Sequence, residues 1–258
     1  MLIDSHCHLH DAKFDTDRPD AIARARAAGV GCILTLGDTL EASRAAMALA
    51  AAEPMVLAAA GVHPCNAEWW SDDVAVELEA LLATGGVAVL GEIGIDYYWV
   101  KEQPARDHQR RAFREQLAMA RRLGYAVSIH ARESLDHVLE DLEAERASEI
   151  GGVLHCFNGD WNQARRGLDM GMAIGVGGTS TYPKSIELRD VIRRVGIGSI
   201  VLETDAPYLA PQKQRGKRNE PAFVAHVAAA MGELFGLPVE EVARVTSDNA
   251  RRALKLPA

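Results

Sequence analysis

The sequence predicts an α/β protein in which eight strand–helix units close into a single-domain (β/α)8 TIM barrel, with an extra helix at the C-terminal end. Short apolar runs alternate along the chain with longer amphipathic segments, which is typical of parallel strands joined by helices. The 258 residues also match the usual size of one such barrel, about 250 residues. We therefore expect one domain over residues 1–258.

The predicted elements follow one another in a regular order. The candidate strands are Leu2–His6, Cys32–Leu36, Met55–Ala60, Ala88–Glu92, Ala126–His130, Gly152–His155, Met172–Val176 and Ser199–Glu203. The candidate helices are Asp20–Ala28, Leu40–Ala52, Asp73–Ala83, Arg106–Leu123, Leu135–Arg146, Asn162–Met170, Ile186–Arg194, Phe223–Phe235 and Val239–Leu254. Glycines stand where a predicted helix gives way to a strand, as C-terminal caps do, for example Gly29, Gly124, Gly171 and Gly196.

Composition excludes several classes of protein. With 48% apolar residues, the chain is too apolar to be disordered. The 28 Lys and Arg against 36 Asp and Glu give a net charge of −8, whereas a protein that coats duplex DNA is normally basic. The four cysteines lie far apart, which indicates a reducing compartment, and no segment resembles a signal peptide or a membrane span. We expect a cytoplasmic protein that binds no membrane and needs no stable protein partner.

Four histidines lie at the ends of predicted strands, where a (β/α)8 barrel builds its active site. His6 and His8 end the first strand and point the same way, because strand side chains alternate with period two, while Cys7 points to the helix layer. His130 and His155 end the fifth and sixth strands. A structural role could explain any one of these histidines but not their common position, so we predict that they bind metal.

Two carboxylates complete the predicted metal site, because Glu92 ends the fourth strand and Asp205 the eighth. A catalytic zinc usually takes three protein ligands, so four imidazoles and two carboxylates suit two cations better than one. Glu92 lies near the centre of the strand order and is the natural bridge between them. Nitrogen-rich ligation favours Zn²⁺ or Mn²⁺ over Mg²⁺, but affinity does not tell which ion a cell supplies, and Mg²⁺ stays open.

Further acidic residues are predicted to assist these ligands. Asp205 can reach both the metal and the attacking water, so we assign it as the general base, with Glu92 as the second catalytic residue. Glu203 has the same strand parity as Asp205 but lies one layer deeper, and is expected to orient a ligand histidine. Asp96 is expected to lie behind the ligands, and either Asp96 or Glu133 is an alternative partner for Arg132.

Basic groups near the predicted site could bind a phosphodiester. His63 is a candidate donor to a phosphate oxygen, or only a turn residue. Arg132 shares the parity of His130 and could form a phosphate fork, or pair with a neighbouring carboxylate. The loop that carries Arg215, Lys217 and Arg218 could contact a nucleic-acid backbone, or be a solvated surface loop.

Aromatic residues follow the same strand ends. Tyr97, Tyr98 and Trp99 come after the fourth strand, and Tyr208 comes after the eighth. Bases stack on such rings without any readout of sequence, but packing at the rim of the barrel explains the rings equally well. Both interpretations stay open.

Seven motifs in order resemble the TatD family of metal-dependent hydrolases. They are D-S-H-C-H-L at the start, G-V-H-P at 61–64, G-E-I-G-I-D-Y-Y at 91–98, I-H-A-R-E at 129–133, H-C-F-N-G at 155–159, E-T-D-A-P-Y-L at 203–209 and R-G-K-R-N-E-P at 215–221. The resemblance implies an amidohydrolase-like barrel with the ligands His6, His8, Glu92, His130, His155 and Asp205. One departure is His10, where the family often has an acidic residue.

The resemblance also implies the reaction, because the family contains metal-dependent deoxyribonucleases that act as 3′-exonucleases. We therefore expect hydrolysis of phosphodiester bonds at single-stranded ends of DNA or RNA, by water activated between two metals. Two alternatives stay open. The same site could hydrolyse an ester or amide, as in a D-aminoacyl-tRNA deacylase, or the protein could be a metal-binding scaffold without catalysis.

Overall fold

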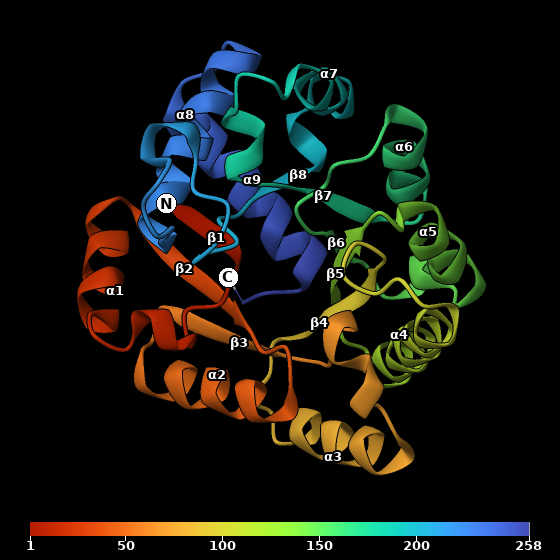
Figure 1. Cartoon of the computed structure of the whole chain (residues 1–258). Helices are drawn as coiled ribbons and strands as arrows, with labels where there is room; N and C mark the ends of the chain where they lie inside the picture. Colours follow the sequence, from red (N-terminus) through yellow and green to blue (C-terminus); the bar gives the residue numbers. More distant parts are fainter. Residues whose placement is uncertain (258) are drawn as a thin grey trace.

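The computed structural model describes residues 1–257 and contains a barrel of eight parallel strands (Figure 1). Each strand pairs in parallel with the next one along the chain, in the order β1 to β8. The strands are β1 (Leu2–Cys7), β2 (Val30–Leu36), β3 (Val56–Ala60), β4 (Val89–Asp96), β5 (Val127–Arg132), β6 (Gly152–Leu154), β7 (Met172–Val176) and β8 (Ile200–Leu202). The predicted (β/α)8 barrel is confirmed.

Helices surround this barrel, and the last helix of the described residues lies across one end of it (Figure 1). They are α1 (Arg18–Ala27), α2 (Leu40–Ala52), α3 (Asp72–Ala83), α4 (Gln103–Leu123), α5 (Leu135–Ala144), α6 (Trp161–Asp169), α7 (Ile186–Val195), α8 (Val224–Phe235) and α9 (Val239–Leu254). Local sequence signals define their ends: Thr39 accepts a hydrogen bond from an amide of the first turn of α2, and Gly124 caps α4 with a left-handed φ of 80°. Both α2 and α9 begin and end where the sequence predicts.

Strand ends differ from the prediction at the rim that carries the candidate site. Pairing of β4 with β5 continues to Asp96 opposite Arg132, so both strands extend beyond their predicted ends at Glu92 and His130. By contrast, β6 and β8 end one residue earlier than predicted, at Leu154 and Leu202. Shortly after each of these two strands the backbone takes a positive φ, 44° at Cys156 and 56° at Asp205, which departs from the extended ladder.

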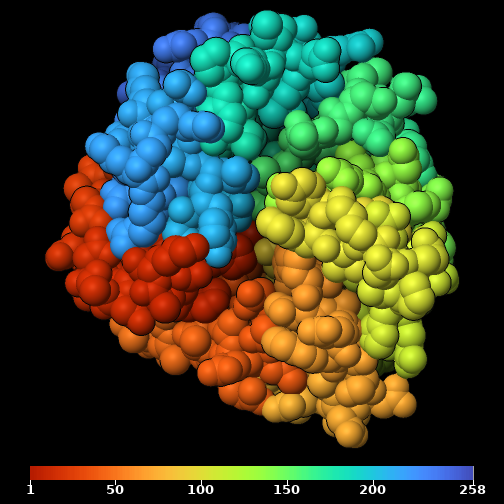
Figure 2. All heavy atoms as spheres, viewed as in Figure 1, coloured from red at the N-terminus to blue at the C-terminus, as the bar shows by residue number. Residues whose placement is uncertain are grey.

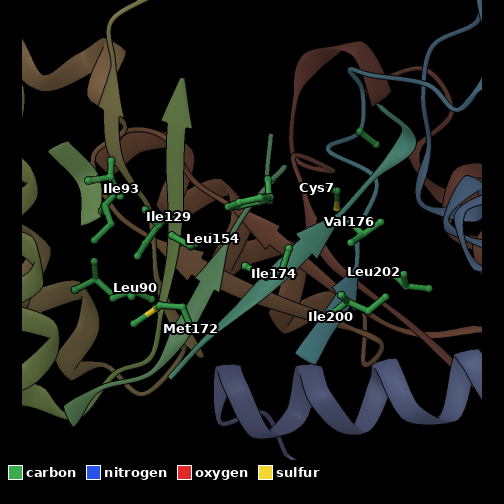
Figure 3. Packing of buried hydrophobic residues seen from close by; sticks show 14 of the residues in the cluster. Cys7, Leu90, Ile93, Ile129, Leu154, Met172, Ile174, Val176, Ile200 and Leu202 are labelled. Atoms are coloured by element: carbon green, nitrogen blue, oxygen red, sulfur yellow. The ribbon is translucent and has the colours of Figure 1, made fainter. Parts of the chain in front are cut away.

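Alternate strand residues form two separate cores. Outward-facing residues such as Leu154 and Ile174 pack in one large cluster with the helix layer (Figure 3). Inward-facing residues, among them Ile3 and Val89, form a second cluster with Leu254 of α9. The strand sequences predict that side chains alternate between two faces, and the two cores consist of these two alternating sets.

Helix α9 closes the amino-terminal end of the barrel. The Asn249 side-chain amide donates to the backbone carbonyl of Ile200 at 2.8 Å, and the Ser247 hydroxyl donates to that of Met1 at 3.0 Å. The opposite end, where the strands terminate, is left for the candidate site. No single helix within residues 1–257 is long and apolar enough to cross a bilayer; only the pair Pro221–Phe235 and Val239–Leu254, taken together across a 107° bend, meets that length and apolarity.

The barrel closes where β1 meets the segment after β8. Cys7 and Ala206 form a parallel β-bridge. The buried carboxyl group of Asp4 accepts hydrogen bonds from the Thr204 amide at 2.9 Å and from the Thr204 hydroxyl at 2.7 Å. These contacts fix the backbone next to Asp205.

Candidate metal centre

The structure brings the six predicted ligand side chains together inside the carboxyl-terminal end of the barrel. Cys7 belongs to the outer core, so the neighbouring His6 and His8 point inward, as the alternation of the strand predicts. Figure 2 views this end of the molecule and shows a central depression between the yellow segment near residue 100 and the red and light-blue segments near residues 10 and 210.

Glu92 lies at the centre of the cluster, with its side chain buried. Its Oε2 lies 3.4 Å from Nε2 of His6 and 3.4 Å from Nε2 of His8. Its Oε1 lies 2.9 Å from Nδ1 of His130 and 3.8 Å from Nε2 of His155. The two oxygens of one carboxylate therefore face different imidazole rings. Oε2 faces His6 and His8, whereas Oε1 faces His130 and His155 and also lies 3.6 Å from Nε2 of His63.

Asp205 joins the cluster from the other side of the mouth. Its Oδ1 lies 3.6 Å from Nε2 of His8, and 3.9 Å from Nε2 of both His6 and His155. The residue has a left-handed φ of 56°, a conformation that Asp tolerates better than most residues. Its amide donates to the His6 carbonyl at 2.9 Å, which ties this turn to β1.

Hydrogen bonds on the far side of His6 and His8 orient the rings. Nδ1 of His8 must donate to the Leu36 carbonyl at 2.9 Å, because a carbonyl only accepts, so a neutral ring presents the lone pair of Nε2 to the carboxylates. Nδ1 of His6 lies 3.1 Å from the Ser128 hydroxyl. Nε2 of His6 is buried and has no hydrogen-bond partner. Buried polar atoms normally have one, so this nitrogen fits a role as a metal ligand.

Carboxylates lie against the other two rings. Oδ2 of Asp96 lies 3.0 Å from Nε2 of His130, and Oε1 of Glu203 lies 3.0 Å from Nδ1 of His155. Metal-binding histidines commonly contact a carboxylate through the ring nitrogen that does not bind the ion. Gly175 leaves room for Glu203, because a Cβ there would lie 2.6 Å from Oε2 of that carboxylate.

The residues that are present fit divalent cations. Ligand atoms lie within 4.8 Å of one another in each of three groups. Two of them share His6, which are His6, His8 and Asp205, and His6, His155 and Glu203; the third is His63, Glu92 and His130. Imidazole nitrogen together with carboxylate oxygen is a donor set suited to Zn²⁺ and Mn²⁺.

Opposite charges inside the cluster shift the pKa values of its histidine and carboxylate side chains. Burial would lower the pKa of both His8 and His130, but neighbouring carboxylates outweigh it: Asp205 and Glu92 raise the pKa of His8 to about 9, and Asp96 and Glu92 raise that of His130 to about 9. Burial would raise the pKa of Glu92, but His63 and His6 hold it well below its usual range. At neutral pH the metal-free cluster thus holds protons where a cation would bind.

We expect the chelator-treated protein to lose stability as pH rises from about 6.5 to about 9. A histidine whose folded pKa lies above its unfolded value stabilises the fold fully below the unfolded pKa, and this contribution disappears as pH passes the folded pKa. Each pKa unit is worth about 1.4 kcal/mol, so the loss should reach several kcal/mol. Urea denaturation at a series of pH values measures it.

The metal-loaded protein is the control for this experiment, because cations replace the protons of His8 and His130 and the decline should be smaller over the same range. A metal-free protein whose stability stays constant or rises between pH 6.5 and 9 would contradict the electrostatic description of the cluster.

Two predicted substrate contacts lie at the edge of the cluster. Nε2 of His63 is 3.6 Å from Oε1 of Glu92, closer to the ligands than the sequence indicates. Arg132 is exposed, and its guanidinium lies 3.8 Å from the centre of the Tyr98 ring. Of the alternatives for Arg132, the structure does not show a pair with Asp96 or Glu133, because Asp96 contacts His130 and Glu133 contacts Lys101.

The basic loop after β8 is only partly available to a substrate. Arg218 donates to both carboxylate oxygens of Asp17, at 2.6 and 2.8 Å. This ion pair fixes the loop against the start of α1 and leaves the guanidinium less available to a phosphate. Arg215 and Lys217 are exposed, and Arg215 lies 4.4 Å from the centre of the Tyr182 ring. Of the three basic residues, these two remain candidates for contact with a phosphate.

Sequence reasoning missed some supporting residues. Ser128 lies two residues before His130 and shares its parity, a signal that could have identified it, but its contact with His6 depends on how the strands meet. His10 bonds through Nδ1 to the Thr35 hydroxyl at 3.1 Å rather than joining the cluster. The supporting layer is thus defined by tertiary contacts.

Comparisons with known proteins identify the family of the chain. Residues 3–255 match the family model described as TatD related DNase. The chain is 38% identical over 262 residues to the uncharacterized metal-dependent hydrolase YcfH of Escherichia coli (strain K12), covering 100% of this chain and 97% of the relative. It is 34% identical over 261 residues to the 3'-5' ssDNA/RNA exonuclease TatD of Edwardsiella piscicida, covering 99% of this chain and 100% of that protein.

A solved structure extends the similarity to three dimensions. The crystal structure of YJJV, a TatD homologue from Escherichia coli K12, matches with a TM-score of 0.92 and 34% identity, over 99% of this chain and 98% of that one. The family model, the relatives and the fold point the same way. The chain belongs to the TatD family of metal-dependent hydrolases.

Proposed function

We propose that the protein is a 3′-exonuclease that hydrolyses phosphodiester bonds at single-stranded ends of DNA or RNA, with two divalent cations held on either side of Glu92. The observation that supports this proposal most is that the two oxygens of Glu92 face different histidines at 2.9–3.8 Å. His6 and His8 lie at Oε2, and His130, His155 and His63 lie at Oε1. The name of the Edwardsiella relative, a 3'-5' ssDNA/RNA exonuclease, supports the substrate.

The proposed ligands divide between the two sides of Glu92. His6, His8 and Asp205 would hold one cation together with Oε2, and His130 and His155 would hold the other together with Oε1. Zn²⁺ or Mn²⁺ suits this donor set best, and Mg²⁺ is the third candidate. The whole chain is proposed to act as one hydrolase domain.

When bound, such a pair of cations lowers the pKa of a water molecule and neutralises charge on a phosphate. The side chains supply the rest. Asp205, at the outer edge, accepts the proton of the attacking water. Asp96 and Glu203 keep His130 and His155 in place.

His63 is proposed to donate a hydrogen bond to a phosphate oxygen rather than to bind metal. Its Nδ1 accepts a hydrogen bond from the Cys65 amide at 3.1 Å, so a neutral ring carries its proton on Nε2, the atom that faces the cluster. Burial lowers the pKa of His63 to about 3, so the ring is neutral at pH 7. His8 has the opposite tautomer, because its Nδ1 donates to Leu36.

We expect His63→Ala to lower kcat about 100-fold, the usual cost of removing one donor to a developing oxyanion, while metal content stays unchanged. Metal analysis by mass spectrometry and kcat on a labelled oligonucleotide measure the two quantities. His63→Gln, which keeps a donor, should recover part of the rate. If His63→Ala lost as much metal as His8→Ala, His63 would be a ligand and the assignment would be wrong.

The experiment that tests the proposed function compares substrates. A single-stranded DNA labelled at its 5′ end should be shortened stepwise with Mn²⁺, Zn²⁺ or Mg²⁺, and a chelator should stop the reaction. Duplex DNA should be a poor substrate, because a protein of net charge −8 neutralises few phosphates. Hydrolysis of D-aminoacyl-tRNA without shortening of DNA would support the deacylase alternative, and no metal-dependent hydrolysis at all would support a scaffold.

A further inference from the structure

A cluster of exposed aromatic and cationic side chains lies next to the candidate metal centre. It consists of Tyr98, Trp99 and Arg132, and we call it the Trp99 platform. Trp99 is 66% exposed and Tyr98 40% exposed, so both rings present apolar surface to solvent. The Arg132 guanidinium carbon lies 3.8 Å from the centre of the Tyr98 ring and 5.7 Å from that of the Trp99 ring. We propose that this platform binds the terminal nucleotide of a single-stranded nucleic acid, with its base on Trp99 and its phosphate on Arg132.

Two hydrogen bonds connect the platform to a proposed metal ligand. The Trp99 amide donates to Oδ1 of Asp96 at 2.8 Å, and Oδ2 of the same carboxylate lies 3.0 Å from Nε2 of His130. Arg132 follows His130 by two residues on β5. A nucleotide stacked on Trp99 would therefore have its phosphate beside the metal centre.

The backbone beneath the platform is held on both sides. The Tyr97 amide donates to the Arg132 carbonyl at 2.9 Å. Arg106 donates to the Val100 carbonyl at 3.1 Å, and its guanidinium packs 4.3 Å from the centre of the Tyr97 ring. Tyr97 itself is buried and cannot stack on a base. A rigid support lowers the entropy that binding would otherwise cost.

Arg132 is free to bind an anion. Its guanidinium rests on Tyr98, and among residues 1–257 its side chain forms no ion pair or hydrogen bond. Glu133, the adjacent acidic residue, contacts Lys101 at 3.5 Å instead. An exposed ring beside an unpaired guanidinium matches the two chemical parts of a nucleotide, a base and a phosphate.

The opposite side of the mouth carries a second pair of this kind. Tyr208 is 46% exposed, its ring centre lies 6.2 Å from that of His8, and Lys13 lies 4.1 Å from its ring centre. In Figure 2 a depression lies between the yellow segment near residue 100 and the red and light-blue segments near residues 10 and 210. A single strand that crosses this depression would place one phosphodiester over the proposed metals. This arrangement favours a nucleic-acid end as the occupant over a small ester.

The platform inference rests on the proposed function, so the test separates the two. Hydrolysis of bis(4-nitrophenyl) phosphate reports on the metal centre, and a short oligothymidylate inhibits that reaction if it binds at the mouth. We expect Trp99→Ala to raise the inhibition constant of the oligothymidylate about tenfold, which is typical of losing one stacked base. Where the oligothymidylate is cleaved, its KM should rise by the same factor. The rate on bis(4-nitrophenyl) phosphate should change less than twofold. Trp99→Phe should retain most of the binding.

The matched control is Trp69→Ala. Trp69 is 58% exposed, much like Trp99, and within the described residues it takes part in none of the aromatic–cation contacts. This variant should bind the oligothymidylate as the unmodified protein does. Arg132→Ala should weaken binding of oligonucleotides about as much as Trp99→Ala.

An oligothymidylate whose terminal nucleotide lacks a base identifies the contact. The unmodified protein should bind it about tenfold more weakly than the complete oligomer, and Trp99→Ala should bind both equally. Equal inhibition constants of the oligothymidylate for the unmodified protein and for Trp99→Ala would overturn the platform. So would a fall in the rate of hydrolysis of bis(4-nitrophenyl) phosphate by Trp99→Ala that is as large as its loss of oligothymidylate binding. Strong inhibition without cleavage would instead overturn the proposed exonuclease and leave the platform supported.

Discussion

Glu92→Gln is expected to remove most of the bound metal and to lower the rate of hydrolysis by more than about 100-fold. Residues that only support a metal ligand already cost about 10- to 100-fold when they are changed, and Glu92 is proposed to contact both cations. A neutral amide cannot balance two cations, and its NH₂ group would face histidine nitrogens that now lie 2.9–3.8 Å from the carboxylate. Metal content by mass spectrometry and kcat/KM on single-stranded DNA measure the two effects.

His108→Ala is the matched control for Glu92→Gln. Nε2 of His108 lies 3.2 Å from the Trp70 carbonyl, away from the cluster, so metal content and rate should stay close to those of the unmodified protein. Full metal occupancy in Glu92→Gln would contradict the bridging assignment. An equal loss in His108→Ala would show that the effect is not specific to the cluster.

Asp205→Asn is expected to lower kcat about 1,000-fold or more, because an amide neither binds a cation well nor accepts the proton of the attacking water. General bases typically contribute about 10²–10⁴-fold. The fold should survive, because Asn tolerates the left-handed φ of 56° at least as well as Asp does. The hydrogen bond from the backbone amide of residue 205 to the His6 carbonyl is also kept.

Circular dichroism and thermal unfolding establish that Asp205→Asn folds, and single-turnover cleavage of DNA gives its rate. His226→Ala is the control, because His226 contacts Gln214 outside the cluster and should change the rate less than twofold. A folded Asp205→Asn protein that retains more than a tenth of the rate would exclude Asp205 as the base.

The side chains that the structure gathers as candidate ligands could be predicted to lie together from the sequence, because strand alternation is a local property. His6 and His8 share a parity, Glu92 and His130 lie on neighbouring strands, and a barrel brings the ends of its strands to one rim. The same argument assigned Glu203 to a deeper layer, where it contacts His155 at 3.0 Å.

Partners that meet only in three dimensions could not be predicted. Arg218 pairs with Asp17, 201 residues away, and no local pattern distinguishes it from Arg215 or Lys217. Asp96 was one alternative partner of Arg132 and lies directly opposite it on β5, yet its carboxylate contacts the imidazole of His130. The side chain that a carboxylate contacts depends on rotamers and burial, which strand parity does not define.

The central claim is that Glu92 joins two cations, and anomalous diffraction from crystals grown with Zn²⁺ or Mn²⁺ tests it most directly. Data on both sides of the absorption edge of the metal locate each ion independently of the protein. We predict two peaks, one within bonding distance of Oε2 of Glu92 beside His6 and His8, and the other within bonding distance of Oε1 beside His130. A fully occupied single peak with the Glu92 carboxylate turned away, or two peaks of which neither contacts Glu92, would contradict the proposed centre.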